Sequence, residues 1–328
     1  MVKNKCVSII LPTFNDEKTI ARAIKSVILQ SYSNWELIVI NDNSQDRTLS
    51  VIKNFNDERI HVVNNHVNKG LAYSRNIGLD RASGEYIAFL DADDWIDPDF
   101  LNKNISELVL RNADISVNDI KLVYGNKLKT QSCYADPFKS YPSVWNKVYK
   151  STLWENIEFD IERQIEDFGL VPFLFFKSKK SIKITDTYYF YYQSSTSLVH
   201  SKIDINKQLK VADDVRTFLD KLSERQLYRY NDSIMKYVSY QLSEHFWKGV
   251  EDSSSINELK ELYLYLALYS KKLNVSLFNF NKTFYSENLY QELRNTLILP
   301  FFSLNKYKIG KNIYSTILKL KRYLKSIK

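Results

Sequence analysis

Glycine is scarce in this sequence, with 7 in 328 residues, and no glycine pattern typical of a nucleotide-binding loop is present. Gly70, Gly78 and Gly84 do not form G-x-G-x-x-G, and no G-x-x-x-x-G-K-[ST] loop occurs. The pattern disfavours a dinucleotide dehydrogenase and a P-loop enzyme. If this chain binds a diphosphate, it has to neutralise the charge in some other way, and a metal ion held by carboxylates would do so.

Cysteine and histidine are also few. Cys6 and Cys133 have no metal spacing, and the four histidines are isolated from one another. This argues against a disulfide framework and a structural zinc site, and it fits a reducing compartment. No stretch reaches about 18 uninterrupted apolar residues, and the N-terminus leads directly into a strand pattern. We therefore expect neither a membrane-spanning helix nor a secretory signal, and we expect a cytoplasmic protein.

The formal net charge of +8 comes from one segment of the chain. Residues 301–328 contain eight Lys and Arg residues and no Asp or Glu, so residues 1–300 sum to zero. A nucleic-acid-binding protein usually carries basic residues over a folded face with readable motifs, and none occurs here. We therefore predict no nucleic-acid partner.

Apolar runs alternate with helical patterns through the first part of the chain. This spacing predicts a parallel sheet with right-handed crossovers. The expected strands are 7–11 (ended by Pro12), 35–40, 60–63 and 86–90, and the expected helices are 18–30, 46–55 and 71–82.

Three carboxylates follow the fourth apolar run, in Asp91-Ala92-Asp93-Asp94. The run delivers them to the C-terminal edge of the sheet, where open α/β sheets bind ligands. Clustered carboxylates repel one another unless a cation lies among them, and hard oxygen ligands suit Mg²⁺ or Mn²⁺. The alternative is a solvated acidic turn in which Asp94 or Asp97 caps the helix after Pro98.

Four blocks of sequence occur in this order: Pro12-Thr13-Phe14-Asn15, Ile40-Asn41-Asp42-Asn43-Ser44, Asn68-Lys69-Gly70 through Arg75-Asn76-Ile77-Gly78, and Phe89-Leu90-Asp91-Ala92-Asp93-Asp94. Together they resemble family 2 glycosyltransferases, which have the GT-A fold. The resemblance implies an α/β protein with a Rossmann-like, mostly parallel sheet flanked by helices. A mainly helical C-terminal region is expected to follow.

The same resemblance assigns the residues that bind a nucleotide-sugar donor. They are Pro12, Thr13, Asn15, Asp42, Arg75, Asp91, Ala92 and Asp93. Asp93 is the main candidate metal ligand with Asp91 beside it, the metal being Mn²⁺ or Mg²⁺, and Asp94 supports them. The family's residue at Asp42 accepts the imide N–H of uracil. Arg75 could contact the base or orient an acid. The alternatives are that Asp42 caps the next helix and that Arg75 forms a surface ion pair.

On the acceptor side, Glu166-Asp167 opens a helical pattern and resembles the family's catalytic acidic pair. Acids at a helix start also complement its dipole, which is the alternative explanation. With the resemblance, Asp167 is the expected general base and Glu166 its neighbour. Trp145 and Lys147 are weaker acceptor-side candidates, and whether His200 joins the metal site stays open. The arginine often found near Gln193 is missing, which puts a diphosphate contact from that loop in doubt.

We therefore expect a catalytic domain over 1–200, a helical region over 201–300 and a basic tail over 301–328. Within the catalytic domain, the nucleotide-sugar half extends to about residue 120 and the acceptor half follows it. The tail has an apolar stripe through Ile313, Ile317, Leu320 and Leu324. A cationic face opposite this stripe predicts peripheral binding to the anionic inner face of the cell membrane. The alternative is that the stripe packs on the helical region.

The expected function is metal-dependent, inverting transfer of a sugar, from a nucleotide diphosphate sugar such as a UDP-sugar, to a hydroxyl of a glycan or lipid-linked acceptor. The setting would be bacterial surface polysaccharide or glycolipid synthesis. Two alternatives remain. A sugar nucleotidyltransferase would need an early glycine-rich loop, but residues 8–22 contain no glycine. A catalytically silent sugar-nucleotide or glycan-binding protein would not need both Asp93 and Asp167.

Overall fold

The computed structural model describes residues 5–137, 140–159, 161 and 167–193. Glu166, His200, the expected boundary near residue 200, the helical region and the basic tail lie outside these residues. Within the described residues, no helix is long and apolar enough to span a lipid bilayer.

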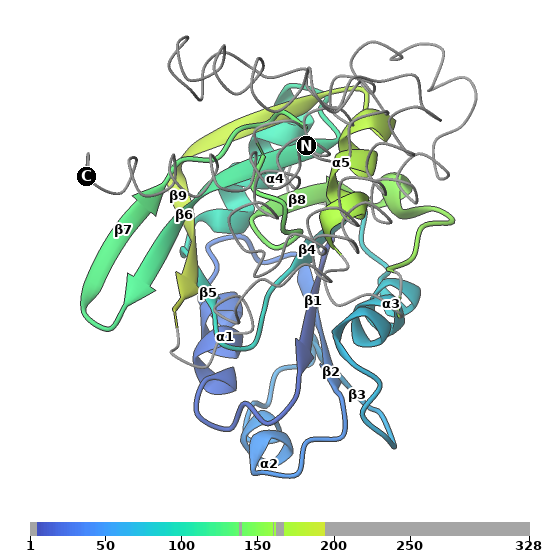
Figure 1. Ribbon diagram of the computed structural model, residues 1–328, viewed down its shortest axis with the longest axis vertical. Helices are drawn as coiled ribbons and strands as arrows, with labels where there is room; N and C mark the ends of the chain where they lie inside the picture. The colour runs from blue at the N-terminus through green and yellow to red at the C-terminus, as the bar shows by residue number, and fades with distance from the viewer. Residues whose placement is uncertain (1–4, 138–139, 160, 162–166, 194–328) are drawn as a thin grey trace, which may run out of the picture. The chain divides into compact units, whose positions relative to one another are not determined.

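The first part of the chain forms the predicted alternation of strands and helices (Figure 1). Strands β1, β2, β3 and β4 are parallel, in the order β3-β2-β1-β4. Figure 1 shows α1 and α3 on opposite sides of these strands. The elements are β1 (Val7–Thr13), α1 (Ile20–Ile28), β2 (Trp35–Asn41), α2 (Thr48–Ile52), β3 (Ile60–Asn64), α3 (Leu71–Arg81) and β4 (Tyr86–Phe89).

The observed bounds differ from the prediction at the ends of both helices and strands. Pro12 does not end β1, because the strand continues to Thr13, and Pro12 pairs in parallel register with Ile40. The prediction that Pro12 terminates the strand was therefore wrong. Asp42, one residue beyond β2, donates its backbone N–H over 2.9 Å to the carbonyl of Thr13, the last residue of β1, so β1 and β2 end side by side.

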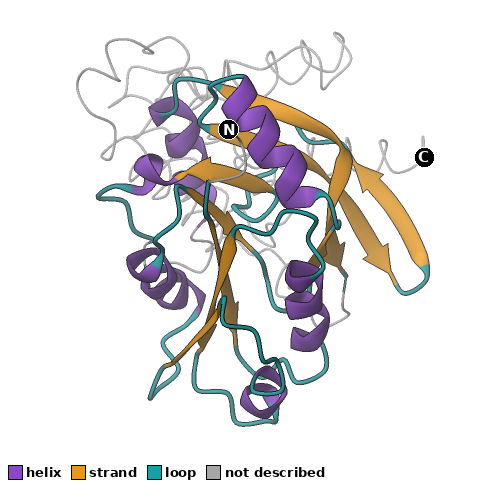
Figure 2. Cartoon of the chain, turned by 180° about the vertical axis from the view of Figure 1, so that it is seen from behind, coloured by secondary structure: helices purple, strands orange, loops and turns teal. Residues whose placement is uncertain are grey.

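The rest of the sheet mixes directions. Strand β8 is antiparallel to both β4 and β6, while β9 is parallel to β6 and antiparallel to β5. Figure 2 shows the β6–β7 hairpin extending from the sheet. These elements are β5 (Trp95–Ile96), α4 (Phe100–Leu110), β6 (Ile115–Tyr124), β7 (Lys127–Gln131), β8 (Lys147–Lys150), η1 (Ser151–Trp154), α5 (Asp167–Lys177) and β9 (Ser181–Tyr192).

Helix α3 packs closely on the parallel strands at Gly78. A Cβ atom at this position would lie 2.3 Å from Cγ2 of Ile10, well inside van der Waals contact. The absence of a side chain therefore lets the helix backbone approach β1. Arg75 lies one turn earlier on this helix and is 1% exposed. The close packing at Gly78 thus fixes the position of a buried guanidinium near the end of β4.

Candidate active site

The carboxylate cluster lies at the end of β4, as predicted. Asp91 and Asp93 are partly exposed, whereas Asp94 is fully buried. Asp94 accepts hydrogen bonds from the Tyr189 hydroxyl over 2.8 Å and from the Tyr192 backbone N–H over 2.7 Å. The alternative that Asp94 caps the following helix is wrong, because its carboxylate instead anchors strand β9.

Burial and mutual repulsion make this cluster electrostatically unfavourable without a cation. The pKa of Asp93 is raised to about 6, mainly by burial and then by the charges of Asp91 and Asp16. Burial also raises the pKa of Asp16, which follows the end of β1 and accepts hydrogen bonds from the Thr13 hydroxyl and the Phe14 N–H. Sequence reasoning missed Asp16, although it lies in the loop that carries Asn15.

Arg22 of α1 brings a positive charge behind the cluster. Its guanidinium donates to the Asp93 carbonyl oxygen and lies 4.1 Å from the centre of the Trp95 ring and 4.9 Å from that of Tyr192. The contact with these two rings holds the guanidinium in place, so that a cation lies beside the acid cluster. This residue was also not predicted from the sequence.

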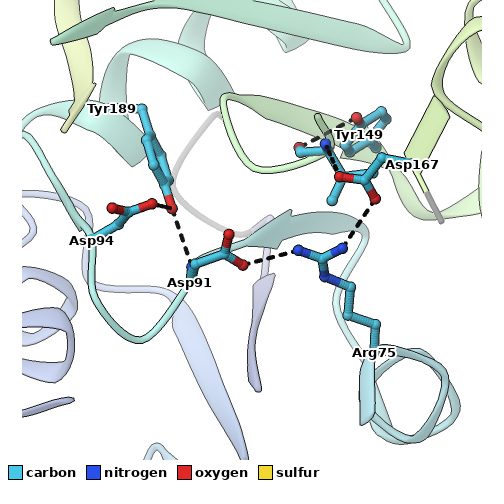
Figure 3. Close-up of polar contacts among 7 residues, drawn as sticks. Arg75, Asp91, Asp94, Tyr149, Asp167 and Tyr189 are labelled. Carbon is cyan, nitrogen blue, oxygen red and sulfur yellow. Dashed lines mark hydrogen bonds and ion pairs between the residues drawn. The ribbon is translucent and has the colours of Figure 1, made fainter. Parts of the chain in front are cut away.

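Arg75 connects the acid cluster with the acceptor-side carboxylate (Figure 3). One terminal nitrogen donates to Asp91 over 2.9 Å, and the other donates to Asp167 over 3.0 Å. The alternative of a surface ion pair is wrong, because the Arg75 side chain is 2% exposed. A contact of Arg75 with a donor base stays a prediction.

Asp167 is the first residue of α5, and its side chain is 12% exposed. Its Oδ1 faces Arg75, and its Oδ2 accepts the Val144 backbone N–H over 3.2 Å. Burial raises the pKa of this carboxyl, and the Arg75 charge opposes part of that rise. Each carboxylate oxygen has two lone pairs, so the group retains the capacity to accept a proton.

The loops after β1 and β2 lie together on the same edge of the sheet. The Asn15 N–H donates to the Ser44 hydroxyl over 3.0 Å, and the Asn15 side-chain oxygen accepts the Gln45 N–H over 2.7 Å. Thr13 is 3% exposed and bonds Asp16. The structure thus brings Pro12, Thr13 and Asn15 to the edge where the acid cluster lies.

Asp42 is buried and holds the chain that leads into α3. Its carboxylate accepts the Asn65 side-chain amide over 2.7 Å and the backbone N–H groups of Lys69 and Gly70. The alternative that Asp42 caps the next helix, α2, is therefore wrong. Contact with a nucleotide base stays a prediction for this residue.

Trp145 and Lys147 are both buried, at 4% and 0% exposure. The Trp145 ring stacks on Tyr189 with centroids 4.4 Å apart. The Lys147 ammonium donates to the Tyr141 and Ser143 carbonyls and to the Asn146 side-chain oxygen, each over 2.7 Å. These contacts hold both side chains inside the protein, and contact with an acceptor stays a prediction.

The donor chemistry at the end of β4 fits a hard divalent cation that is only partly coordinated by protein. Asp91 and Asp93 offer carboxylate oxygens, and the pKa of Asp93 is raised first by burial and then by the neighbouring negative charges. Among the described residues, no three His, Cys, Asp or Glu side chains are grouped closely enough to hold a metal. Mg²⁺ sites in proteins commonly use one or two carboxylates plus substrate phosphates.

Comparison with known proteins gives a consistent family assignment. The family model described as Glycosyl transferase family 2 matches residues 8–177. Glycosyltransferase GlyA of Streptococcus pneumoniae is 28% identical over 304 residues, which is 85% of this chain and 39% of GlyA. UDP-Glc:alpha-D-GlcNAc-diphosphoundecaprenol beta-1,3-glucosyltransferase WfgD of Escherichia coli is 43% identical over 121 residues, 37% of this chain and 45% of WfgD. The chain thus matches less than half the length of either relative.

Solved structures share the fold. TarS residues 1–349 of S. aureus, in complex with UDP-GlcNAc, superpose with a TM-score of 0.69 at 19% identity, covering 97% of this chain and 91% of that one. Mannosyltransferase PcManGT from Pyrobaculum calidifontis, in complex with GDP-Man and Mn²⁺, gives a TM-score of 0.56 at 15% identity, with 96% and 84% covered. The predicted Rossmann-like α/β fold of the GT-A type is confirmed.

Proposed function

Because this chain belongs to glycosyl transferase family 2, we propose that it is a metal-dependent, inverting glycosyltransferase. It transfers a sugar from a nucleotide diphosphate sugar, of which a UDP-sugar is the best candidate, to an acceptor hydroxyl. The observation that carries this proposal is the convergence of Asp91 and Asp167 on the guanidinium of Arg75. It brings the expected metal site and the expected base into one centre.

Asp93 and Asp91 would hold the metal ion, and the donor diphosphate would complete its coordination. Mn²⁺ or Mg²⁺ bound there would stabilise the negative charge that develops on the leaving nucleotide diphosphate. Arg22 supports this side of the site by binding the Asp93 carbonyl. Asp94 and Tyr189 support it from β9, since the Tyr189 hydroxyl also accepts the Asp91 N–H over 3.1 Å.

Asp167 would accept the proton of the attacking hydroxyl. Its raised pKa makes it a stronger base than an exposed aspartate, while Arg75 keeps the ionised form accessible. A single displacement, with the acceptor hydroxyl entering as the nucleotide diphosphate departs, inverts the anomeric carbon. Glu166 is the neighbouring candidate for the base.

The donor and acceptor classes draw support from the relatives. The name of WfgD specifies a UDP-Glc donor and a diphosphoundecaprenol-linked acceptor, and the TarS complex contains UDP-GlcNAc. By analogy, we propose a UDP-sugar donor and a glycan or lipid-linked acceptor, in bacterial surface polysaccharide or glycolipid synthesis. Asp42, Pro12, Thr13 and Asn15 would bind the nucleoside.

We propose a cytoplasmic enzyme that can dock on the inner face of the cell membrane through residues 301–328. These residues carry the whole +8 excess of charge. Each basic residue near an anionic bilayer contributes about 1 kcal/mol of attraction. Docking of this kind would bring the site close to a lipid-linked acceptor. The domain limits proposed remain 1–200 for catalysis, 201–300 for the helical region and 301–328 for the tail.

The experiment that tests this function is a donor screen. Purified full-length protein is incubated with UDP-, GDP- and dTDP-sugars in the presence of Mn²⁺, and slow donor hydrolysis is followed by nucleotide diphosphate release. We expect release from at least one UDP-sugar. Tight donor binding without hydrolysis would instead indicate a silent binding protein, and synthesis of a nucleotide sugar from a nucleoside triphosphate would indicate a nucleotidyltransferase.

A further inference from the structure

Lys147 is a buried cation enclosed by the segment of chain that precedes it. Residues 141–146, here called the saddle segment, curve around its ammonium group. The Tyr141 carbonyl, the Ser143 carbonyl and the Asn146 side-chain oxygen each accept a hydrogen bond of 2.7 Å. Three N–H groups and three oxygens are thereby matched at a residue with 0% exposure.

The saddle segment contacts both halves of the proposed active site. On one side, the Val144 N–H donates to Oδ2 of Asp167 over 3.2 Å. On the other, the Trp145 ring stacks on Tyr189, with an interplanar angle of 26°. Tyr189 in turn binds both the Asp91 N–H and the Asp94 carboxylate. One short segment therefore positions the expected base and supports the expected metal ligands.

A second set of contacts anchors the saddle segment to the sheet. The Asn146 side-chain amide donates to the Asn118 carbonyl over 2.8 Å, and the Asn118 N–H donates to the Asn146 carbonyl over 2.9 Å. The Tyr149 hydroxyl reaches the Val144 carbonyl over 3.3 Å. These bonds hold Val144 and Asn146, whereas the Lys147 ammonium is the group that binds the carbonyls of Tyr141 and Ser143 in the first half of the segment.

Burial of an ammonium group is unfavourable unless its hydrogen bonds are satisfied. It also lowers the pKa of Lys147 to about 7, which shows how strongly desolvation opposes the charge at this position. A lysine whose only task was to bind an acceptor would need its ammonium at the surface. Its location inside the saddle segment therefore requires another explanation.

We propose that Lys147 is a positioning residue for the transfer reaction. By gathering the carbonyls of the saddle segment, it holds the Val144 N–H against Asp167 and the Trp145 ring against Tyr189. The inference deepens the proposed function and rests on it. It gives Lys147 an internal role, in contrast to the acceptor contact predicted from the sequence.

Two variants and one control test this role. Lys147→Met keeps the length of the side chain and removes the charge and its three hydrogen bonds. Val144→Pro keeps Lys147 and removes the N–H that reaches Asp167. Lys150→Met is the control, because Lys150 ends the same strand and its side chain is 45% exposed. Each is made in the full-length protein, and folding is checked by circular dichroism.

The readouts are UDP affinity in Mn²⁺ and the pH dependence of kcat for donor hydrolysis. We expect Lys147→Met and Val144→Pro to bind UDP within about threefold of wild type and to lose about 10²-fold in kcat, as misplacement of a catalytic group does. The acidic limb of the profile should move to higher pH. The reason is that the Val144 N–H and the Lys147 charge both lower the pKa of Asp167. The Arg75 charge acts in the same direction, and the Asp91 charge acts in the opposite one. Lys150→Met should behave as wild type.

A folded Lys147→Met protein with unchanged kcat and an unchanged acidic limb would overturn the proposal. If Lys147→Met does not fold, the test rests on Val144→Pro, and an unshifted acidic limb in that variant would also overturn the proposal. Different results would overturn the proposed function and the role of Lys147. Absence of hydrolysis by the wild-type protein overturns the proposed function and this inference with it, whereas active wild type with indifferent variants overturns only the inference.

Discussion

Asp91, in the loop after β4, and Asp167, at the start of α5, accept hydrogen bonds from the two terminal nitrogens of the Arg75 guanidinium, at 2.9 and 3.0 Å. Arg75 thus compensates both carboxylates at once in a buried position. The arrangement couples the geometry of the expected metal site to that of the expected base. A substitution of either carboxylate should therefore alter the geometry at the other.

Arg75→Met should strongly destabilise the fold at neutral pH. Removal of one partner leaves buried carboxylates without compensation, which costs about 3–5 kcal/mol in the free energy of unfolding. Without the Arg75 charge the pKa of Asp167 rises further, so the folded variant binds a proton there more readily and its deficit should shrink at acidic pH. Urea unfolding at pH 7 and pH 4.5 measures both effects. Arg81→Met, on the exposed end of the same helix, is the matched control, and equal small losses in both variants would refute the bridging role.

Asp93→Asn should abolish transfer, because it removes an anionic ligand while it preserves the shape of the side chain. Excess EDTA should do the same to the wild-type enzyme, and added Mn²⁺ should restore activity. Nucleotide diphosphate release in the donor screen is the measurement. Asp80→Asn, an exposed carboxylate on α3, serves as the control. Full turnover in EDTA would show that the reaction needs no metal ion.

The same Asp93→Asn substitution should stabilise the metal-free protein at pH 7. The pKa of Asp93 is raised to about 6 from 3.8, so the folded protein binds this proton more tightly than the unfolded chain. Wild-type stability should therefore rise as pH falls from 7 toward 4, and the variant should lack this part of the dependence. We expect a gain of about 1–2 kcal/mol at pH 7, discounted from the full shift for partial exposure. Thermal unfolding in EDTA across that range is the test, and a less stable variant at pH 7 would contradict the prediction.

The basic tail should confer binding to anionic membranes. Liposome flotation compares the full chain with a version that ends at Pro300, using vesicles with and without anionic lipid. We expect the full chain alone to float, only with anionic vesicles, and to be released by high salt because screening weakens surface attraction. Equal recovery of both versions, or binding by neither, would favour a tail that packs on the helical region.

The fold of the parallel half followed from local patterns. Apolar runs ended by polar residues, with helical periodicity between them, define β1 to β4 and α1 to α3. The four motif blocks lie at the ends of these strands and, for the third block, in the first turns of α3. Strands β6, β7 and β8 were not predicted. The pairing of β8 with β4 and of β6 with β9 joins segments far apart in the sequence, which no local period reveals.

The sequence predicted many of the residues in the candidate site, but not the contacts between them. A helical arginine carries no local signal that it will be buried, and only the glycine three residues later, Gly78, hints at close packing on that face. Asp16 and Arg22 have no distinctive spacing either. Lys147 was predicted as an acceptor-side candidate, yet the direction of its side chain depends on how the saddle segment folds around it.

The most direct test of the central claim is the split between kcat and donor affinity in Asp167→Asn. If Asp167 is the general base, the full-length variant should bind UDP in Mn²⁺ as the wild type does, while kcat for donor turnover falls by about 10²- to 10⁴-fold. Glu166→Gln, measured in parallel, should retain more activity. Near wild-type turnover by Asp167→Asn would contradict the account and move the base elsewhere, first to Glu166.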